Sequence, residues 1–161
     1  MSTTQDPESP RGGNEPQGPV VFAYDGSELA KLAIADAGMQ LAPEREALVL
    51  TVWQPFNVGF VPPVALPINA AETAEVRSAA QQTAAEGVSL ASAAGFESRG
   101  LAIEATPTWK AIVDAADEHD ASLIVLGSHG RTGLAGVLIG SVAEAVAAHS
   151  RRSVLITHRS D

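Results

Sequence analysis

Apolar residues along the chain gather in short runs that are typical of buried β-strands. Most of these runs are continuous, but the third alternates larger side chains with small ones and carries charges along its length. A continuous run of this length fits a strand covered on both faces, whereas the charged run fits the edge of a sheet. Strands are therefore predicted at residues 20–24, 47–53, 97–105, 122–126 and 153–157.

Between these runs, apolar residues recur at the three- and four-residue spacing of helices that bury one face. The first predicted helix contains the apolar positions from Ala30 to Leu41, with Asp25 and Glu28 capping its start and Pro43 ending it. Further helices are predicted over about 71–94, from Thr106-Pro107 onward, and over about 141–150. Strand and helix alternate along the chain, which predicts a parallel sheet with right-handed crossovers. The expected fold class is α/β: a single doubly wound domain with helices on both faces of the sheet.

The first residues differ from the rest of the chain. Residues 1–18 are rich in proline and glycine and contain no Val, Ile, Leu or Phe, so they cannot bury enough surface to offset the entropy of ordering. We expect residues 1–18 to form a disordered tail and residues 19–161 to form the folded domain. The proline-rich stretch 55–67 is expected to be a loop, either a lid or an inert insertion.

The composition and the charge of the chain exclude several classes of site and of partner. The 161 residues carry a net charge of −9 and no cysteine, which excludes disulfides and thiolate metal sites. No apolar run is long enough for a membrane span, and no leader-like block opens the chain, so a cytoplasmic location is expected. The acidic balance argues against a nucleic-acid surface. Residues 121–161 have four arginines against Glu144 and Asp161, so an anionic ligand should prefer this region.

Two of the predicted strands are followed by residue types that point to ligand binding. Asp25-Gly26-Ser27 follows the first strand, and Gly127 follows the fourth. In doubly wound sheets the ligand binds beyond the carboxyl ends of the strands, where the winding direction reverses. If the first and fourth strands are neighbours, Asp25 and Gly127 face one crevice.

A glycine-containing segment bridges the fourth strand and the last helix. It has the form G-x2-G-x9-G-S, with its fixed positions at Gly127, Gly130, Gly140 and Ser141. Such glycines let the backbone approach an anion or adopt a positive φ, and the helix start at Ser141 offers free N–H groups to phosphate. Arg131 adds positive charge. Alternatively, Ser141 and Glu144 form a capping box, but this would not account for the glycines at the start of the loop.

Asp25 also has two readings. A carboxylate beside a polyphosphate becomes favourable when a divalent cation joins the two, or when the acid accepts ribose hydroxyls instead. The alternative is that Asp25 only caps the following helix together with Glu28.

Three segments carry a family resemblance: the strand end Ala23-Tyr24-Asp25-Gly26-Ser27, the strand that contains Val52, and the G-x2-G-x9-G-S segment. Together they resemble the universal stress protein family, over about residues 19–159. The resemblance implies a sheet ordered 3-2-1-4-5, a homodimer, and ATP at the switch point with Mg²⁺ or Mn²⁺ accompanying its phosphates. It implies that Asp25 meets the metal or the ribose and that Ala23 and Val52 border adenine. The residues implied for the phosphates and ribose are Gly127, Gly130, Gly140, Ser141 and Val142, with Leu126 and His129 in the same loop.

Other chemistry is weakly supported. The chain has neither the G-x-x-x-x-G-K-[ST] pattern of a P-loop nor a G-x-G-x-x-G after the first strand. His129 lacks an identifiable partner acid for general-base catalysis, so it is expected to be a solvent-exposed loop histidine. An acidic cluster at one helix end is better read as solvated charge than as a metal site. It comprises Asp114, Asp117, Glu118, His119 and Asp120.

The last strand suggests a partner. If 153–157 is an edge, its apolar backbone is expected to pair with a second copy. The leading hypothesis is an ATP-binding homodimer that acts as a stress-response sensor or regulator, reading out to an unknown partner protein. The alternatives are a slow ATP hydrolase or self-phosphorylating protein, and a partner-binding module that takes cyclic AMP or no nucleotide.

Overall fold

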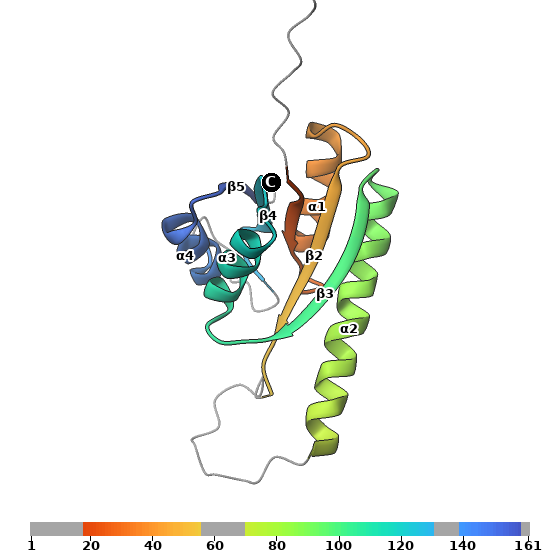
Figure 1. Cartoon of the computed structure of the whole chain (residues 1–161), viewed down its shortest axis with the longest axis vertical. Helices are drawn as coiled ribbons and strands as arrows, with labels where there is room; N and C mark the ends of the chain where they lie inside the picture. The colour runs from red at the N-terminus through yellow and green to blue at the C-terminus, as the bar shows by residue number, and fades with distance from the viewer. Residues whose placement is uncertain (1–17, 56–69, 131–138, 159–161) are drawn as a thin grey trace, which may run out of the picture.

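The computed structural model describes residues 18–55, 70–130 and 139–158 of the chain (Figure 1). Strands and helices alternate through these ranges as the hydrophobic pattern predicts. In chain order they are β1 (Val20–Ala23), α1 (Glu28–Gln40), β2 (Glu46–Trp53), α2 (Ala70–Ala93), β3 (Glu97–Glu104), α3 (Thr108–Glu118), β4 (Leu123–Gly127), α4 (Ser141–His149) and β5 (Ser153–Thr157).

The strands form one parallel sheet in the order β3-β2-β1-β4-β5. The central strand β1 pairs on both sides, so that Val21 lies opposite Leu48 of β2 and Ile124 of β4. The α/β doubly wound class is confirmed, and so is the order 3-2-1-4-5. The winding reverses between β1 and β4, which become neighbours although they are far apart in the sequence.

Helices cover both faces of the sheet and create two apolar cores. On one face, Ala33 and Ile34 of α1 and Ala91 of α2 pack with Phe22, whose ring meets Phe96 edge to face at 5.1 Å between ring centroids. On the other face, side chains of α3 and α4 pack against β1, β2 and β4. Figure 1 shows α2 along β2 and β3, with α3 and α4 grouped beside β4 and β5.

Helix α2 approaches the sheet closely because the residues on its buried side are small. That side presents Ala80, Ala84, Gly87 and Ala91. A Cβ at Gly87 would lie 2.7 Å from both Tyr24 Cδ1 and Val49 Cγ1, so glycine is required for the Tyr24 ring to fit beneath the helix. Gly95 ends this region with a φ of +97°, as the glycine after the predicted helix suggests.

Strands β3 and β5 are the two edges of the sheet, as predicted. Glu97, Arg99 and Glu104 of β3 are exposed, while the central residues of β5, Val154 to Ile156, are half-buried. Within residues 18–55, 70–130 and 139–158, no helix combines the length and the apolar character that crossing a membrane requires.

Candidate functional site

The carboxyl ends of β1 and β4 bring the candidate site residues to one edge of the sheet. Because the two strands are parallel neighbours, the turn after β1 and the loop after β4 leave the sheet side by side. From there the chain enters α1 on one face and α4 on the other. The strand pattern predicts the ligand at this edge, where the winding direction of the sheet reverses.

The turn after β1 is organised by the carboxylate of Asp25. The Ser27 N–H donates to Asp25 Oδ1 at 3.0 Å across Gly26, which has a φ of +80°. The Ser27 hydroxyl accepts from the Ala30 N–H at 3.2 Å and is the N-cap of α1. The prediction that Asp25 and Glu28 cap this helix is therefore wrong: Ser27 is the cap, and Glu28 is the first helical residue and pairs with Lys31 at 3.2 Å.

The same carboxylate meets the loop that follows β4. A Cβ at Gly130 would lie 2.5 Å from Asp25 Oδ2, so a side chain at position 130 would displace the acid. Asp25 is half-buried and Gly130 is exposed. The structure thus brings together two predicted site residues from separate parts of the sequence, at the edge where β1 and β4 end.

Gly127 has a different explanation from the one its motif suggests. A Cβ there would lie 2.8 Å from the Leu29 Cβ and 2.9 Å from the Leu29 carbonyl carbon, so glycine is needed for α1 to pack against β4. None of Gly127, Gly130 and Gly140 has a positive φ, and that part of the prediction is wrong. These glycines instead permit close approach between segments.

Ser128 joins both ends of the loop through its backbone. Its N–H donates to the Thr157 carbonyl of β5 at 2.8 Å, and its carbonyl accepts the Gly140 N–H at 2.7 Å. The side chain is buried, and its hydroxyl lies 3.2 Å from Nδ1 of the half-buried His129. Sequence reasoning missed Ser128, because its contribution depends on main-chain pairing that no residue pattern indicates. Gly140 therefore shapes the loop, and its own amide is already bonded.

The start of α4 supplies amides that face no hydrogen-bond partner in the part of the chain that the structure describes. Gly140 is the N-cap without a side-chain capping bond, and its carbonyl accepts the Glu144 N–H at 2.9 Å. The N–H groups of Ser141, Val142 and Ala143 make no hydrogen bond to another described residue. The capping-box alternative is wrong, because Ser141 is the first residue of the helix and not its cap. Open amides at a helix start form an anion-binding geometry once a ligand is present.

The remaining predicted residues form an apolar flank of this edge. Ala23 and Val52 are half-buried near the ends of β1 and β2, and both pack against the core beneath α3 and α4. Leu126 is buried in the same core. Arg131 lies outside the described residues, as does most of the stretch 55–67, so their predicted roles remain predictions.

Tyr24, immediately before Asp25, is buried, and its hydroxyl has no hydrogen-bond partner within the described ranges. Burial is the main cause that raises the pKa of this hydroxyl, and the nearby Glu86 carboxylate is the next. Glu86 acts here as a neighbouring charge outside hydrogen-bonding geometry. It also pairs with Lys31 at 3.3 Å, and the carboxylates of Glu28 and Glu86 raise the pKa of that lysine.

The acidic cluster at the end of α3 has a structural role. Arg152 donates from Nε to Asp117 and from Nη1 to Asp120, each at 2.9 Å, which ties the end of α3 to the start of β5. No group of three or more His, Asp or Glu side chains within the described ranges is arranged to hold a metal ion. His149 stacks on Trp109 with ring centroids 4.4 Å apart.

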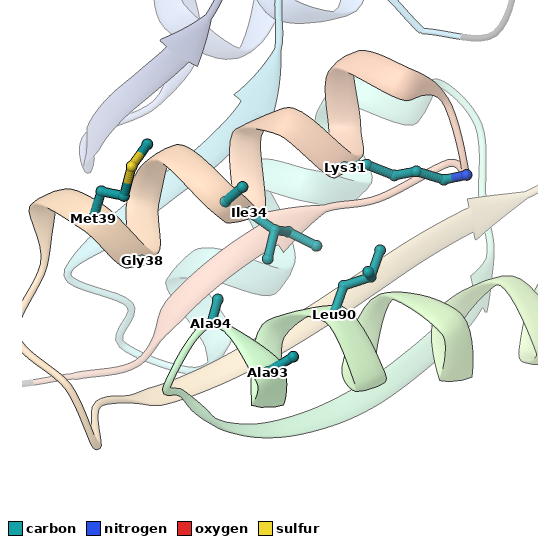
Figure 2. A pocket seen from close by; sticks show the side chains of 8 residues that line it. Lys31, Ile34, Gly38, Met39, Leu90, Ala93 and Ala94 are labelled. Carbon is teal, nitrogen blue, oxygen red and sulfur yellow. The ribbon is translucent and has the colours of Figure 1, made fainter.

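A second hollow lies between α1 and α2, away from the switch point (Figure 2). Ile34, Gly38, Leu90 and Ala94 line it with other apolar residues, and Lys31 lies at one end. Because Lys31 is paired with Glu28 and Glu86, this hollow lacks a charge available for phosphate.

Sequence comparison finds relatives among the universal stress proteins. Universal stress protein Rv2623 of Mycobacterium tuberculosis is 32% identical over 152 residues, which covers 89% of this chain and 46% of that protein. Universal stress protein MJ0577 of Methanocaldococcus jannaschii is 35% identical over 65 residues, 40% of each chain. The chain spans about half the length of the mycobacterial relatives it matches.

Solved structures give the same result. The structure of MJ0577 superimposes with a TM-score of 0.72 at 21% identity, covering 91% of this chain and 99% of that one, which supports the shared fold. A universal stress protein in complex with cAMP has a TM-score of 0.62 at 29% identity and covers 89% of this chain and 98% of its own. The Universal stress protein family matches residues 18–158. The chain belongs to the universal stress protein family.

Proposed function

We propose that this chain binds ATP, with Mg²⁺ or Mn²⁺ accompanying the phosphates, at the carboxyl edge between β1 and β4, and that it acts as a homodimeric regulator in the stress response. The observation that carries the proposal is the convergence of Asp25, the loop at Gly130 and the open amides of α4. A nucleotide polyphosphate needs such donors together with a counter-charge.

The phosphates belong at the start of α4 in this proposal. The N–H groups of Ser141, Val142 and Ala143 point out of the helix start, where the helix dipole favours negative charge. The ordering of Gly140 by Ser128 fixes where these amides begin. Backbone donors stabilise anionic oxygens without exchanging protons with them, so the start of α4 contributes to binding and not to acid–base catalysis.

Asp25 is the counterpart on the other side of the crevice. One oxygen is held by the Ser27 N–H and the other faces Gly130, so the carboxylate has a fixed direction. A single carboxylate fits Mg²⁺, which takes phosphate oxygens and waters as its other ligands. The same position also fits ribose hydroxyls. The half-buried Ala23 and Val52 offer the apolar flank that an adenine ring requires.

A pair of substitutions at Ser141 tests the phosphate site. Ser141→Pro removes one of the open N–H groups, yet proline suits the first position of a helix. The preceding Gly140 has φ −66° and ψ 155°, a conformation compatible with a following proline. Ser141→Ala is the matched control, because it keeps the amide and removes only the hydroxyl.

The affinity for Mg·ATP, measured by isothermal titration calorimetry, should fall about tenfold in Ser141→Pro, the value expected for a lost hydrogen bond to a charged group. Ser141→Ala should stay within about threefold of the wild type. Equal affinity in Ser141→Pro and the wild type, with circular dichroism unchanged, would remove α4 from the binding site.

Cyclic AMP is the second candidate ligand. A relative 29% identical to this chain has been solved in complex with cAMP, and backbone amides do not fix the number of phosphates. The two candidates differ in their need for a cation, because cAMP lacks adjacent phosphates that chelate one. Titrations of ATP and cAMP, each with and without Mg²⁺, separate them: ATP as the ligand predicts an affinity that rises with Mg²⁺, and cAMP predicts no change.

A further inference from the structure

The hydrogen bonds between β1 and β2 continue one residue beyond the paired register of the two strands. The paired register of the two strands ends at Ala23 opposite Leu50. Beyond it, the Tyr24 N–H donates to the Leu50 carbonyl at 2.9 Å, and the Thr51 hydroxyl donates to the Tyr24 carbonyl at 2.9 Å. A side chain therefore completes the pairing where the backbone ladder stops.

The Thr51 hydroxyl is not explained by packing. Thr51 is 5% exposed and lies on the same face of β2 as the apolar Val49 and Trp53. Valine has almost the same shape and would fill this space without placing a polar atom in the core. The hydroxyl instead satisfies the carbonyl of Tyr24, a residue that is 2% exposed. Removing it would leave a buried carbonyl without a partner.

The Tyr24 carbonyl bears directly on the site. It belongs to the planar peptide unit whose N–H is that of Asp25, so the bond from Thr51 fixes the plane from which Asp25 begins. From that plane, the Asp25 carboxylate accepts the Ser27 N–H at 3.0 Å and directs its other oxygen at the Gly130 backbone. Rotation of the peptide would move the carboxylate relative to the loop after β4.

We propose that Thr51 is a positioning residue of the nucleotide site, which acts by orienting the Tyr24–Asp25 peptide and thereby the Asp25 carboxylate. The inference rests on the proposed function, since it assigns Asp25 a part in nucleotide binding. Thr51 itself is buried beneath the turn and touches no ligand. Its effect on affinity passes through Asp25.

A double-mutant cycle between Thr51→Val and Asp25→Asn tests this route. Thr51→Val keeps the shape and removes the hydroxyl, and Thr51→Ser restores the hydroxyl. Asp25→Asn keeps an oxygen that can accept the Ser27 N–H but removes the charge. Calorimetric titration with Mg·ATP should show a loss of about fivefold to tenfold in Thr51→Val and recovery in Thr51→Ser. In the Asp25→Asn background, Thr51→Val should change the affinity by less than about twofold.

A measurement on the ligand-free protein completes the test. The backbone amide resonances of Asp25 and Gly26 should shift in Thr51→Val and return in Thr51→Ser, because these amides follow the affected peptide. The inference is overturned if those resonances do not move, or if Thr51→Val weakens ATP equally in both backgrounds. A wild-type chain that binds no ATP overturns the proposed function, and the inference with it. Normal binding by the wild type and Thr51→Val alike overturns the inference alone.

Discussion

At the scale of single residues, packing explains the buried ring of Tyr24 but not its buried hydroxyl. Tyr24 is the single tyrosine of the chain, and its ring is buried beneath Gly87 of α2 while its hydroxyl has no partner among the described residues. Burial and the neighbouring carboxylates disfavour the phenolate, which raises the pKa of the hydroxyl from its ordinary value of 10.0. The free energy of unfolding should therefore depend on pH in the alkaline range.

The sign of this dependence follows from the raised pKa. The folded state holds the phenolic proton more tightly than the unfolded state, so the contribution of Tyr24 is complete below the ordinary pKa of 10.0. It is lost progressively as the pH rises above that value. Urea unfolding between about pH 8 and about pH 11 should show this decline, and phenolate absorbance should appear together with unfolding.

Tyr24→Phe is the control for this prediction. It removes a buried hydroxyl that makes no hydrogen bond, so the free energy of unfolding near neutral pH should change by less than about 1 kcal/mol. The alkaline decline should become shallower than in the wild type. A Tyr24→Phe protein with an identical pH profile would assign the decline to other groups.

The glycines at positions 127 and 130 should separate folding from binding. A methyl group at Gly127 meets the backbone of Leu29, which cannot move without shifting α1, so Gly127→Ala should lower the free energy of unfolding by about 1 to 3 kcal/mol. At the exposed Gly130, the end of the Asp25 side chain is what a methyl group would meet among the described residues. Gly130→Ala should therefore weaken Mg·ATP binding while urea unfolding changes by less than about 0.5 kcal/mol. The opposite ranking in the two assays would contradict this assignment.

At the scale of elements, sequence reasoning placed the strands and helices well because each is coded by its own periodicity. The predicted range of β5 agrees with the structure, and α2 differs by one residue at each end. The residues that cap the helices were predicted less accurately. At the start of α1, the candidates for the cap are Asp25 and Ser27, and at the start of α4 they are Gly140 and Ser141. Only the backbone geometry decides which residue is the cap.

The cap of α1 gives a prediction at this scale. Ser27→Ala removes the acceptor for the Ala30 N–H and should lower the free energy of unfolding by about 1 kcal/mol, whereas Ser27→Asp should retain most of it. Chemical denaturation measures both. If Ser27→Ala were as stable as the wild type, the Ser27 hydroxyl would have no capping role in solution.

At the scale of the whole molecule, the alternation of strands and helices predicted the class, and the family resemblance supplied the strand order. The detailed site needed the structure, because the approach of Asp25 to Gly130 depends on how a turn and a loop leave adjacent strands. Spacing along the sequence contains no such distance. For the same reason, the sequence could not show that Gly127 packs against Leu29, and the ligand role that the resemblance implies for Gly127 stays a prediction.

The two sheet edges give a prediction about assembly. β3 presents charges along its length, whereas β5 is a short strand with apolar residues at its centre. Unpaired apolar edges favour association with another chain, so we expect β5 to pair with β5 of a second copy. Leu155→Lys should yield monomers by light scattering. Leu101→Lys, at a half-buried leucine of the opposite edge, should leave the dimer intact. A dimeric Leu155→Lys protein with native circular dichroism would place the interface elsewhere.

The N–H of Ser128 bonds to Thr157 and its carbonyl bonds to Gly140. This pairing has a consequence for how ligand preference can change among domains of this kind. Both bonds are formed by main-chain atoms, so apart from the glycine at position 140, where a Cβ would lie 3.0 Å from the Ser128 carbonyl oxygen, they do not depend on the side chains around them. Substitutions in the segment between Ser128 and Gly140 can therefore alter the ligand preference while the backbone that presents the amides of α4 stays the same.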